Sequence, residues 1–287
     1  MRTSLRTILS DPKPRIVPVA HDALSARLIE EAGFELYAVG GFPLVGFRYA
    51  LPDIGLVSFG EMAAGVRDIM MGSSLPVIVD ADDGYGDVKN VARTVQTYEA
   101  MGVSGVAIED QVSPKRCGHL VGKAVVPADA AVAKIRAAVA ARRSNEFVVI
   151  ARTDALAVEG LDATLRRAEQ LATAGADMLF VEAPTSVQEV ETIARQLRGC
   201  APLVINMPGI GRTPFIAAEE LGEMGYSLIL SPAALMVNTI GAMREALRLT
   251  RAGEYADIAA RISIPELTQL LGIGAWSAFE ERILPST

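Results

Sequence analysis

Eight short and mostly apolar runs recur along this chain of 287 residues, and polar residues follow each of them. Runs that stay apolar, rather than alternating with polar residues, are typical of parallel strands covered on both faces. We therefore predict eight buried strands. They span residues 16–20, 36–40, 77–80, 105–109, 148–152, 178–182, 203–206 and 228–231.

Stretches with helical spacing separate the predicted strands, as at 23–32, 88–101, 129–142 and 161–174. A glycine stands where each of several helices should end, namely Gly33, Gly102, Gly175 and Gly225. This regular alternation favours one (β/α)8 TIM barrel over two unrelated domains. We predict a single domain over 1–287, in which 255–287 is a C-terminal helical extension for subunit contacts.

The composition limits what such a chain can do. Hydrophobic residues make up 51% and charged residues 21%, a balance that supports a large core. A net charge of -7 argues against a nucleic-acid partner, because phosphates need a basic face. No apolar run approaches the roughly 20 residues that span a bilayer, and the first 15 residues lack a signal-peptide core. We expect a soluble, cytoplasmic protein with no membrane partner.

Acidic residues gather where the predicted strands end, which is where barrel enzymes carry their chemistry. The most telling are Asp80, Asp82 and Glu109. Carboxylates at one mouth would repel one another without a cation, and oxygen ligands suit Mg2+ or Mn2+. Asp80 and Asp82 are one residue apart, so on a continuing strand both would point to one face. For any single acid, capping of the following helix is an equal alternative.

An arginine and two glycines also follow predicted strands. Arg152 ends an apolar run, where burial of its charge is costly without an anionic partner. Its guanidinium could hold a substrate carboxylate by two-point contact, or form a structural salt bridge. Gly40 and Gly41 let backbone N–H groups approach an anion, although a plain tight turn explains them equally well.

Residues 113–123, SPKRCGHLVGK, lack helical or strand periodicity and are predicted to form a mobile lid. Lys115, Arg116 and His119 surround Cys117, and this positive charge should lower the thiol pKa and make it a usable acid or base. The alternative is an incidental surface thiol. Cys200 precedes a strand and is interpreted as a small buried apolar residue without chemistry, and the two cysteines predict no disulfide framework. For His21, structural and functional roles both stay open.

Six motifs together resemble the isocitrate lyase and phosphoenolpyruvate mutase superfamily over about residues 5–249. They are LPDIG (51–55), DADDGYG (80–86), IEDQ (108–111), PKRCGH (114–119), IARTDA (150–155) and VEAP (181–184). The resemblance implies that Asp80 contacts Mg2+. It also implies that Asp53, Asp82 and Glu109 hold the ion through water.

The resemblance assigns further roles. It implies that Arg152 and the backbone at Gly40 and Gly41 bind a small anionic 2-oxo or 2-hydroxy acid. Cys117 would be the lyase acid/base on a gating loop. Lys115, Arg116, Gly118 and His119 complete the loop motif, and Tyr37, Glu182 and Asn206 would line the pocket. Homotetramers with exchanged C-terminal helices are expected.

Three departures from the family pattern affect the part of the pocket that should bind the variable end of the substrate. Val39 replaces a Ser or Thr, the stretch NMPGIGRTP (206–214) has no acid before Arg212, and LSPAALM (230–236) lacks a Tyr-Pro pair.

We therefore expect a Mg2+-dependent carbon–carbon lyase for a substituted malate or a (methyl)isocitrate-like 2-hydroxy acid, with release of an oxo acid. The alternatives are a phosphonomutase of the carboxyphosphonoenolpyruvate type, an oxaloacetate hydrolase or decarboxylase, and a dicarboxylate binder without catalysis. The general base is open between Tyr37 and a metal-bound hydroxide.

Overall fold

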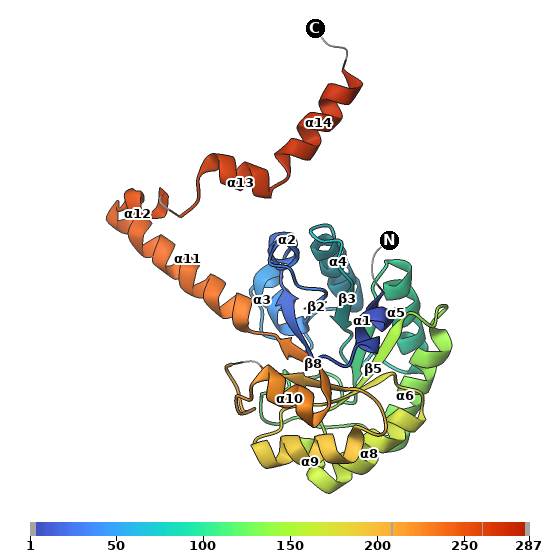
Figure 1. Ribbon diagram of the computed structural model, residues 1–287. Coiled ribbons are helices and arrows are strands. Elements are labelled where there is room, and N and C mark those ends of the chain that lie inside the picture. Colours follow the sequence, from blue (N-terminus) through green and yellow to red (C-terminus); the bar gives the residue numbers. More distant parts are fainter. Residues whose placement is uncertain (1–3, 208, 260, 285–287) are drawn as a thin grey trace. The chain divides into compact units, whose positions relative to one another are not determined.

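The eight strands form a closed barrel in which every neighbouring pair is parallel (Figure 1). This computed structural model describes residues 4–207, 209–259 and 261–284. Residues 1–3, 208, 260 and 285–287, which fall within predicted ranges, lie outside the described residues. The predicted (β/α)8 barrel is confirmed. Its strands are β1 (Arg15–Ala20), β2 (Tyr37–Val39), β3 (Val77–Asp80), β4 (Gly105–Glu109), β5 (Val148–Thr153), β6 (Met178–Val181), β7 (Leu203–Asn206) and β8 (Tyr226–Ser231).

The strand boundaries differ from the predicted ones only at some ends. β3, β4 and β7 begin and end where the apolar runs do. β5 continues to Thr153 because Thr153 pairs with Val181, and β8 begins at Tyr226 because Tyr226 pairs with Leu203. Hydrogen-bonded pairing, and not apolar character, decides these ends.

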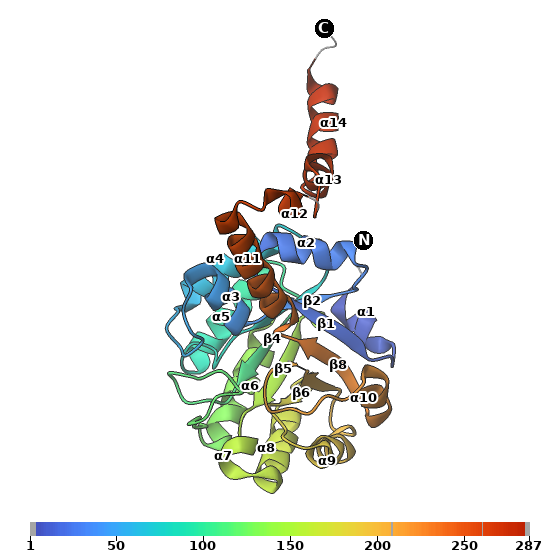
Figure 2. The ribbon, with the colours of Figure 1, turned by 90° about the vertical axis from the view of Figure 1, so that its left-hand side faces the viewer.

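Helices surround the barrel, and those predicted are present to within a residue at each end (Figure 2). The Asp22 carboxylate accepts a hydrogen bond from the Ser25 N–H at 2.7 Å, so this strand-end acid is a helix cap. The helices of the first 224 residues are α1 (Leu5–Ser10), α2 (Ala23–Glu31), α3 (Gly41–Tyr49), α4 (Phe59–Met70), α5 (Val88–Ala100), α6 (Ala128–Ala141), α7 (Leu156–Glu159), α8 (Leu161–Thr173), α9 (Val187–Leu197) and α10 (Ala218–Met224).

Two apolar clusters form the core. One fills the barrel and contains Val17, Ile150 and Phe180, and the other packs the outer faces of the strands against the helices. Leu5 and Ile8 of α1 belong to the inner cluster, and the Leu5 side chain lies beside Gly105, the first residue of β4. Since α1 covers the amino-terminal end of the strands, the opposite end is left for a site.

The chain divides into two compact units, 1–236 and 237–287. The second contains most of α11 (Ala234–Ala252), with α12 (Tyr255–Ala259), α13 (Ile264–Leu270) and α14 (Ile273–Ile283). Neither α13 nor α14 buries a residue, and Trp276 is 72% exposed. Among the described residues, no helix is both long enough and apolar enough to cross a membrane.

Gly72, two residues after the end of α4, lies against the first residue of α2, and this close contact predicts the effect of a substitution on stability. A Cβ at Gly72 would overlap the backbone carbonyl of Ala23, which cannot move without displacing α2. Gly72→Ala should therefore lower the free energy of unfolding by about 2–4 kcal/mol, measured by urea denaturation.

The matched control is Gly60→Ala. Gly60 lies in the first turn of α4, and a Cβ there would meet nothing within 4 Å. Alanine should leave stability unchanged or raise it by about 0.5–1 kcal/mol. Equal stability of the two variants would contradict the close approach.

Candidate active site

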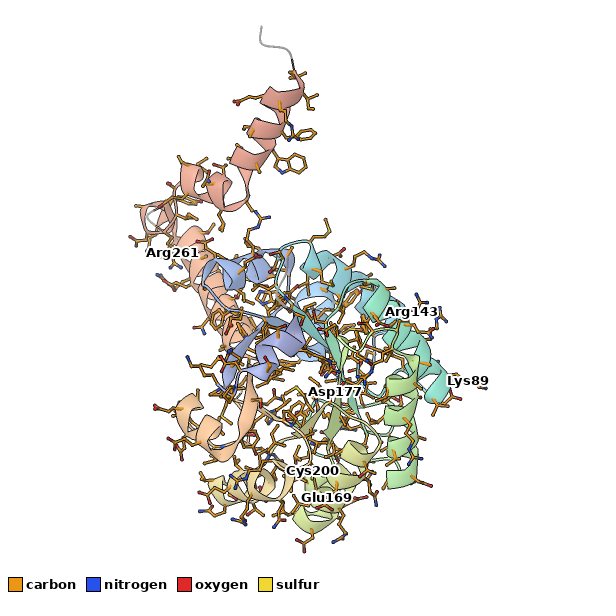
Figure 3. All side chains as sticks on the ribbon, turned by 45° about the vertical axis from the view of Figure 1, so that its right-hand side comes forward. Lys89, Arg143, Glu169, Asp177, Cys200 and Arg261 are labelled. Carbon is orange, nitrogen blue, oxygen red and sulfur yellow. The ribbon has the colours of Figure 1, made fainter. Side chains whose placement is uncertain are left out.

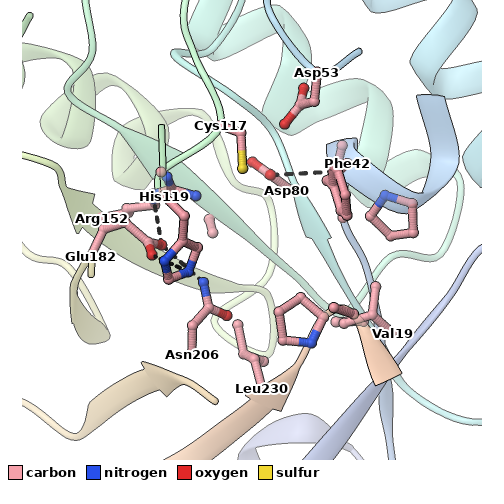
Figure 4. A pocket seen from close by; sticks show the side chains of 18 of the residues that line it. Val19, Phe42, Asp53, Asp80, Cys117, His119, Arg152, Glu182, Asn206 and Leu230 are labelled. Atoms are coloured by element: carbon pink, nitrogen blue, oxygen red, sulfur yellow. Dashed lines mark hydrogen bonds and ion pairs between the residues drawn. The ribbon is translucent and has the colours of Figure 1, made fainter. Parts of the chain in front are cut away.

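A cavity of about 270 Å³ opens at the carboxyl ends of the strands and gathers most of the predicted site residues (Figure 4). The lining includes Gly40 and Gly41 after β2, and residues 115, 117–120 of the segment after β4. Its polar side chains are Asp53, Asp80, Lys115, Cys117, His119, Arg152, Glu182 and Asn206. Tyr37, Asp82 and Glu109 are not among the lining residues.

Lys115 joins the acidic residues at one side of the cavity. Its buried ammonium lies 2.6 Å from an Asp53 oxygen and 2.7 Å from an Asp82 oxygen. Burial opposes the charge of Lys115, but the carboxylates of Asp82 and Asp80 outweigh it and raise its pKa well above the ordinary value. The lysine is therefore a fixed cation beside these acids.

Asp80 and Asp82 do not share one strand face, contrary to the prediction. β3 ends at Asp80, and Asp82 adopts a positive φ of 48° in the following turn. The Asp82 N–H donates to the Asp80 carboxylate at 3.0 Å, and the Gly41 N–H approaches the same carboxylate at 3.4 Å. The turn after β3, and not a shared strand face, therefore places Asp82 next to Asp80.

The buried carboxylates suit a hard cation. Neither oxygen of Glu109 has a hydrogen-bond partner, and burial raises the pKa of Glu109 well above its ordinary value and that of Asp82 to about 6. A nearby dication would favour the charged form of both acids. Within the described ranges, no three His, Cys, Asp or Glu side chains converge as a complete direct ligand set. The Glu109 oxygens, which lack hydrogen-bond partners, nevertheless fit a nearby divalent ion.

Arg152 lies at the end of β5 among three carboxylates. Its Nε lies 2.9 Å from Asp154 and 3.5 Å from Glu182, and Nη2 lies 3.3 Å from Glu109. Although burial disfavours its charge, these carboxylates raise the Arg152 pKa well above the ordinary value. The structural salt bridge is present, and the charged guanidinium also lines the cavity, so its contact with a substrate carboxylate stays a prediction.

Glu182, Asn206 and His119 form a second polar group. Asn206 Nδ2 donates to Glu182 at 2.9 Å, and His119 Nε2 lies 3.3 Å from the other Glu182 oxygen. Burial lowers the His119 pKa, so the ring is neutral at pH 7. A neutral ring and an amide can exchange hydrogen bonds with a substrate oxygen without adding charge.

Cys117 reaches the cavity from residues 113–123, but its predicted electrostatics are wrong. Lys115 is committed to Asp53 and Asp82, and burial raises the pKa of the Cys117 thiol. The Cys117 N–H donates to the Asp53 carbonyl at 3.1 Å, which fixes the thiol beside the acidic group. A raised pKa keeps the proton on sulfur, as a proton donor requires.

Gly118 brings the same segment into close contact with the cavity wall. A Cβ at Gly118 would lie 2.5 Å from Glu182 Cγ and 2.6 Å from Arg152 Nη2. Only glycine allows this approach.

Lys123 is a site residue that the motif reasoning missed. Its buried ammonium donates to the Gly118 carbonyl at 2.6 Å and lies 2.7 Å from Asp154. Asp154 in turn holds Arg152, and Asp110 fixes Asp154 through a bond from the Asp154 N–H at 2.8 Å. Lys123 thus connects residues 113–123 to Arg152. The signal in the sequence was a second lysine at the end of the glycine-containing segment.

Tyr37 and Cys200 differ from expectation, and His21, for which both roles were open, lies away from the cavity. Tyr37 is fully buried in the cluster between strands and helices, since Ala38 takes the inward position on β2, so the structure does not support it as the base. Cys200 is exposed and not buried, because it lies in the turn after α9 (Figure 3). His21 stacks on Phe47 at 3.8 Å and does not line the cavity.

Comparison with known proteins agrees with this geometry. Residues 5–251 match the family described as Phosphoenolpyruvate phosphomutase. A probable 2-methylisocitrate lyase 2 of Corynebacterium glutamicum is 41% identical over 98% of this chain and 92% of its own length. A 2,3-dimethylmalate lyase of Eubacterium barkeri is 39% identical over 80% of this chain and 79% of its own length.

Solved structures of members of the same superfamily are also similar to this chain. A 2,3-dimethylmalate lyase, described as a PEP mutase/isocitrate lyase superfamily member, is 37% identical with a TM-score of 0.90, over 97% of this chain and 93% of that one. An oxaloacetate acetylhydrolase with 3,3-difluorooxalacetate is 32% identical with a TM-score of 0.92, over 97% and 95%.

The Lys123 bridge yields a prediction. Lys123→Met removes the ammonium but keeps a stem of similar length, so the Gly118 carbonyl loses its donor and residues 113–123 loosen. Tryptic cleavage after the exposed Arg116 should become at least about tenfold faster. The control is Lys89→Met on α5, an exposed position far from the segment, which should not change it (Figure 3). Unchanged cleavage in Lys123→Met would show that the bridge does not hold the segment.

Proposed function

The chain belongs to the phosphoenolpyruvate phosphomutase family, and on that premise we propose that it is a Mg2+-dependent carbon–carbon lyase acting on a substituted malate. Its products would be a 2-oxo acid and a carboxylic acid. One observation carries the proposal: the Cys117 thiol, Arg152 and Asp80 line the same small cavity (Figure 4). Relatives named 2-methylisocitrate lyase and 2,3-dimethylmalate lyase support the reaction class.

Binding uses the charges already described. Arg152 offers its guanidinium to the carboxylate beside the hydroxyl-bearing carbon, C2. Gly41 leaves room for that carboxylate, because a side chain there would crowd the cavity. A Cβ at Gly41 would lie only 3.2 Å from Asp53 and from Lys115. Asp80, with Asp53, Asp82 and Glu109 through water, would hold Mg2+, which supplies positive charge next to the C2 oxygen.

Cleavage then needs two proton movements. A lining carboxylate accepts the hydroxyl proton, the C2–C3 bond breaks, and its electron pair becomes the enolate of the C3 carboxyl group. The Cys117 thiol donates its proton to C3 and is later reprotonated from solvent. Asn206 and His119 lie where they can hydrogen-bond the C3 carboxylate, and residues 113–123 exclude water from the enolate.

The thiol favours carbon–carbon cleavage over phosphoryl migration. Phosphoryl migration needs no proton donor for a departing carbon, whereas cleavage of the C2–C3 bond needs one at the position of Cys117. Hydrolysis of oxaloacetate also releases a carbanion, and the named relatives, not the thiol, favour the lyase over it. A pure dicarboxylate binder gives no reason for a half-buried, protonated thiol beside the acids. That the enzyme works in the cytoplasm stays a prediction from the sequence.

Cys117→Ser should lower kcat by about 10²- to 10⁴-fold, the usual contribution of a positioned acid or base. Serine has nearly the same shape but a much higher pKa, so it is a poor proton donor. The assay is release of 2-oxo acid from 2,3-dimethylmalate. The exposed Cys200→Ser is the control and should keep wild-type kcat. A wild-type kcat in Cys117→Ser would remove the thiol from the mechanism.

Metal removal gives a separate prediction. Exhaustive chelation should abolish turnover, and Mg2+ or Mn2+ should restore it, because the buried carboxylates need a dication to face an anionic substrate. Circular dichroism before and after chelation checks that the fold is retained. Full activity of the chelated enzyme would exclude this metal site.

We also propose a homotetramer in which the C-terminal helices contact another subunit. In support, α13 and α14 expose large apolar side chains, among them Ile264 (72%), Trp276 (72%) and Ile283 (63%). Such surface is costly to leave in water. Light scattering at micromolar concentration should report four chains, and Trp276→Glu with Ile283→Glu should lower that number. A wild-type monomer would be incompatible with the proposal.

A further inference from the structure

The wall of the cavity away from the acids is apolar and comes from several strands. Val19 and Ile78 belong to the cluster inside the barrel, and Leu230 packs against that cluster. Phe180 also lines the cavity, but its ring lies 5.4 Å from the Arg152 guanidinium. Val39, Ile210, Pro232 and Ala233 complete this wall on the side formed by β2 and by the segments after β7 and β8. Figure 4 shows Leu230 and Val19 on the side of the cavity opposite Arg152.

The cations of the cavity are already paired. Among the described lining residues, the charged side chains are Asp53, Asp80, Glu182, Lys115 and Arg152. Lys115 contacts two acids at 2.6 and 2.7 Å, and Arg152 contacts carboxylates at 2.9 to 3.5 Å. With a dication, these lining groups together keep one net positive charge, so each substrate carboxylate beyond the first adds uncompensated negative charge. Beyond Asn206 and His119, which the C3 carboxylate uses, a third carboxylate would find apolar side chains and no unpaired cation among the described lining residues.

We propose that this enzyme is selective for malates whose remaining C3 substituent is an uncharged alkyl group, and that it discriminates against tricarboxylates. The inference rests on the proposed lyase function and assigns its substrate class. It separates this chain from the activity named for its 2-methylisocitrate lyase relatives, because 2-methylisocitrate carries a third carboxylate on its C3 substituent. A buried carboxylate without a cation is strongly disfavoured, whereas an alkyl group gains from burial.

The sharpest probe pair differs only in charge. 2-Methyl-3-isobutylmalate has the heavy-atom shape of 2-methylisocitrate, with two methyl groups in place of the two oxygens of the third carboxylate. With Mg2+ and wild-type enzyme, we expect kcat/KM to be at least about 100-fold higher for the isobutyl compound. An equal or higher value for 2-methylisocitrate would overturn the proposal while leaving the lyase function intact.

A variant pair tests the apolar wall directly. Ile210 is 50% exposed in the segment after β7, so a longer side chain fits there without unfolding the barrel. Ile210→Arg supplies a cation and should reduce the preference for the isobutyl compound at least tenfold. Ile210→Met introduces an unbranched but neutral side chain, so it should preserve the preference for the isobutyl compound. A similar change in both variants would contradict the charge argument.

Binding of the carboxylic acid products tests the alkyl preference even when neither malate is cleaved. The second products of the two reactions would be 4-methylpentanoate and succinate. Calorimetry with Mg2+ and pyruvate present should show 4-methylpentanoate binding at least about tenfold more tightly than succinate. Tighter succinate binding would refute the alkyl preference, whereas absent turnover of every malate tested would refute the lyase function alone.

Discussion

The buried guanidinium of Arg152 organises the carboxyl end of this barrel. A charge in a water-poor interior is tolerated only with close counter-charges, and Asp154, Glu109 and Glu182 supply them from three neighbouring strands. Asp154 also holds Lys123, and Lys123 holds the Gly118 carbonyl. One electrostatic network therefore fixes Arg152 and the segment that carries the thiol.

A second cation, Lys115, performs the same task on the opposite side. It draws Asp53 and Asp82 together and leaves Cys117 with its proton. The positive charge of Lys115 therefore stabilises the acids and does not activate the thiol, which matches a role in donating a proton to carbon. The paired cations and the apolar wall leave no unpaired cation for a third substrate carboxylate among the described lining residues.

Much of the fold was predictable from local pattern. The apolar runs and glycine-terminated helices place all eight strands, because both faces of a parallel strand are covered and only such residues fit there. The strand-end rule also found Asp80, Arg152, Glu182 and Asn206, which do line the cavity. The family resemblance, and not the strand-end rule, assigned Tyr37 to the pocket, and the tyrosine instead lies in the cluster between strands and helices.

The sequence by itself determined the barrel, the identity of the acids at its mouth and the presence of a thiol on the segment after β4, since these follow from periodicity and from motif. Only the tertiary structure decided which charges are paired. Lys123 and Asp154 are 31 residues apart, and their contact depends on how two segments fold back over one mouth. The raised thiol pKa, the role of Lys123 and the uncharged wall are all consequences of burial and long-range neighbours, which no local pattern encodes.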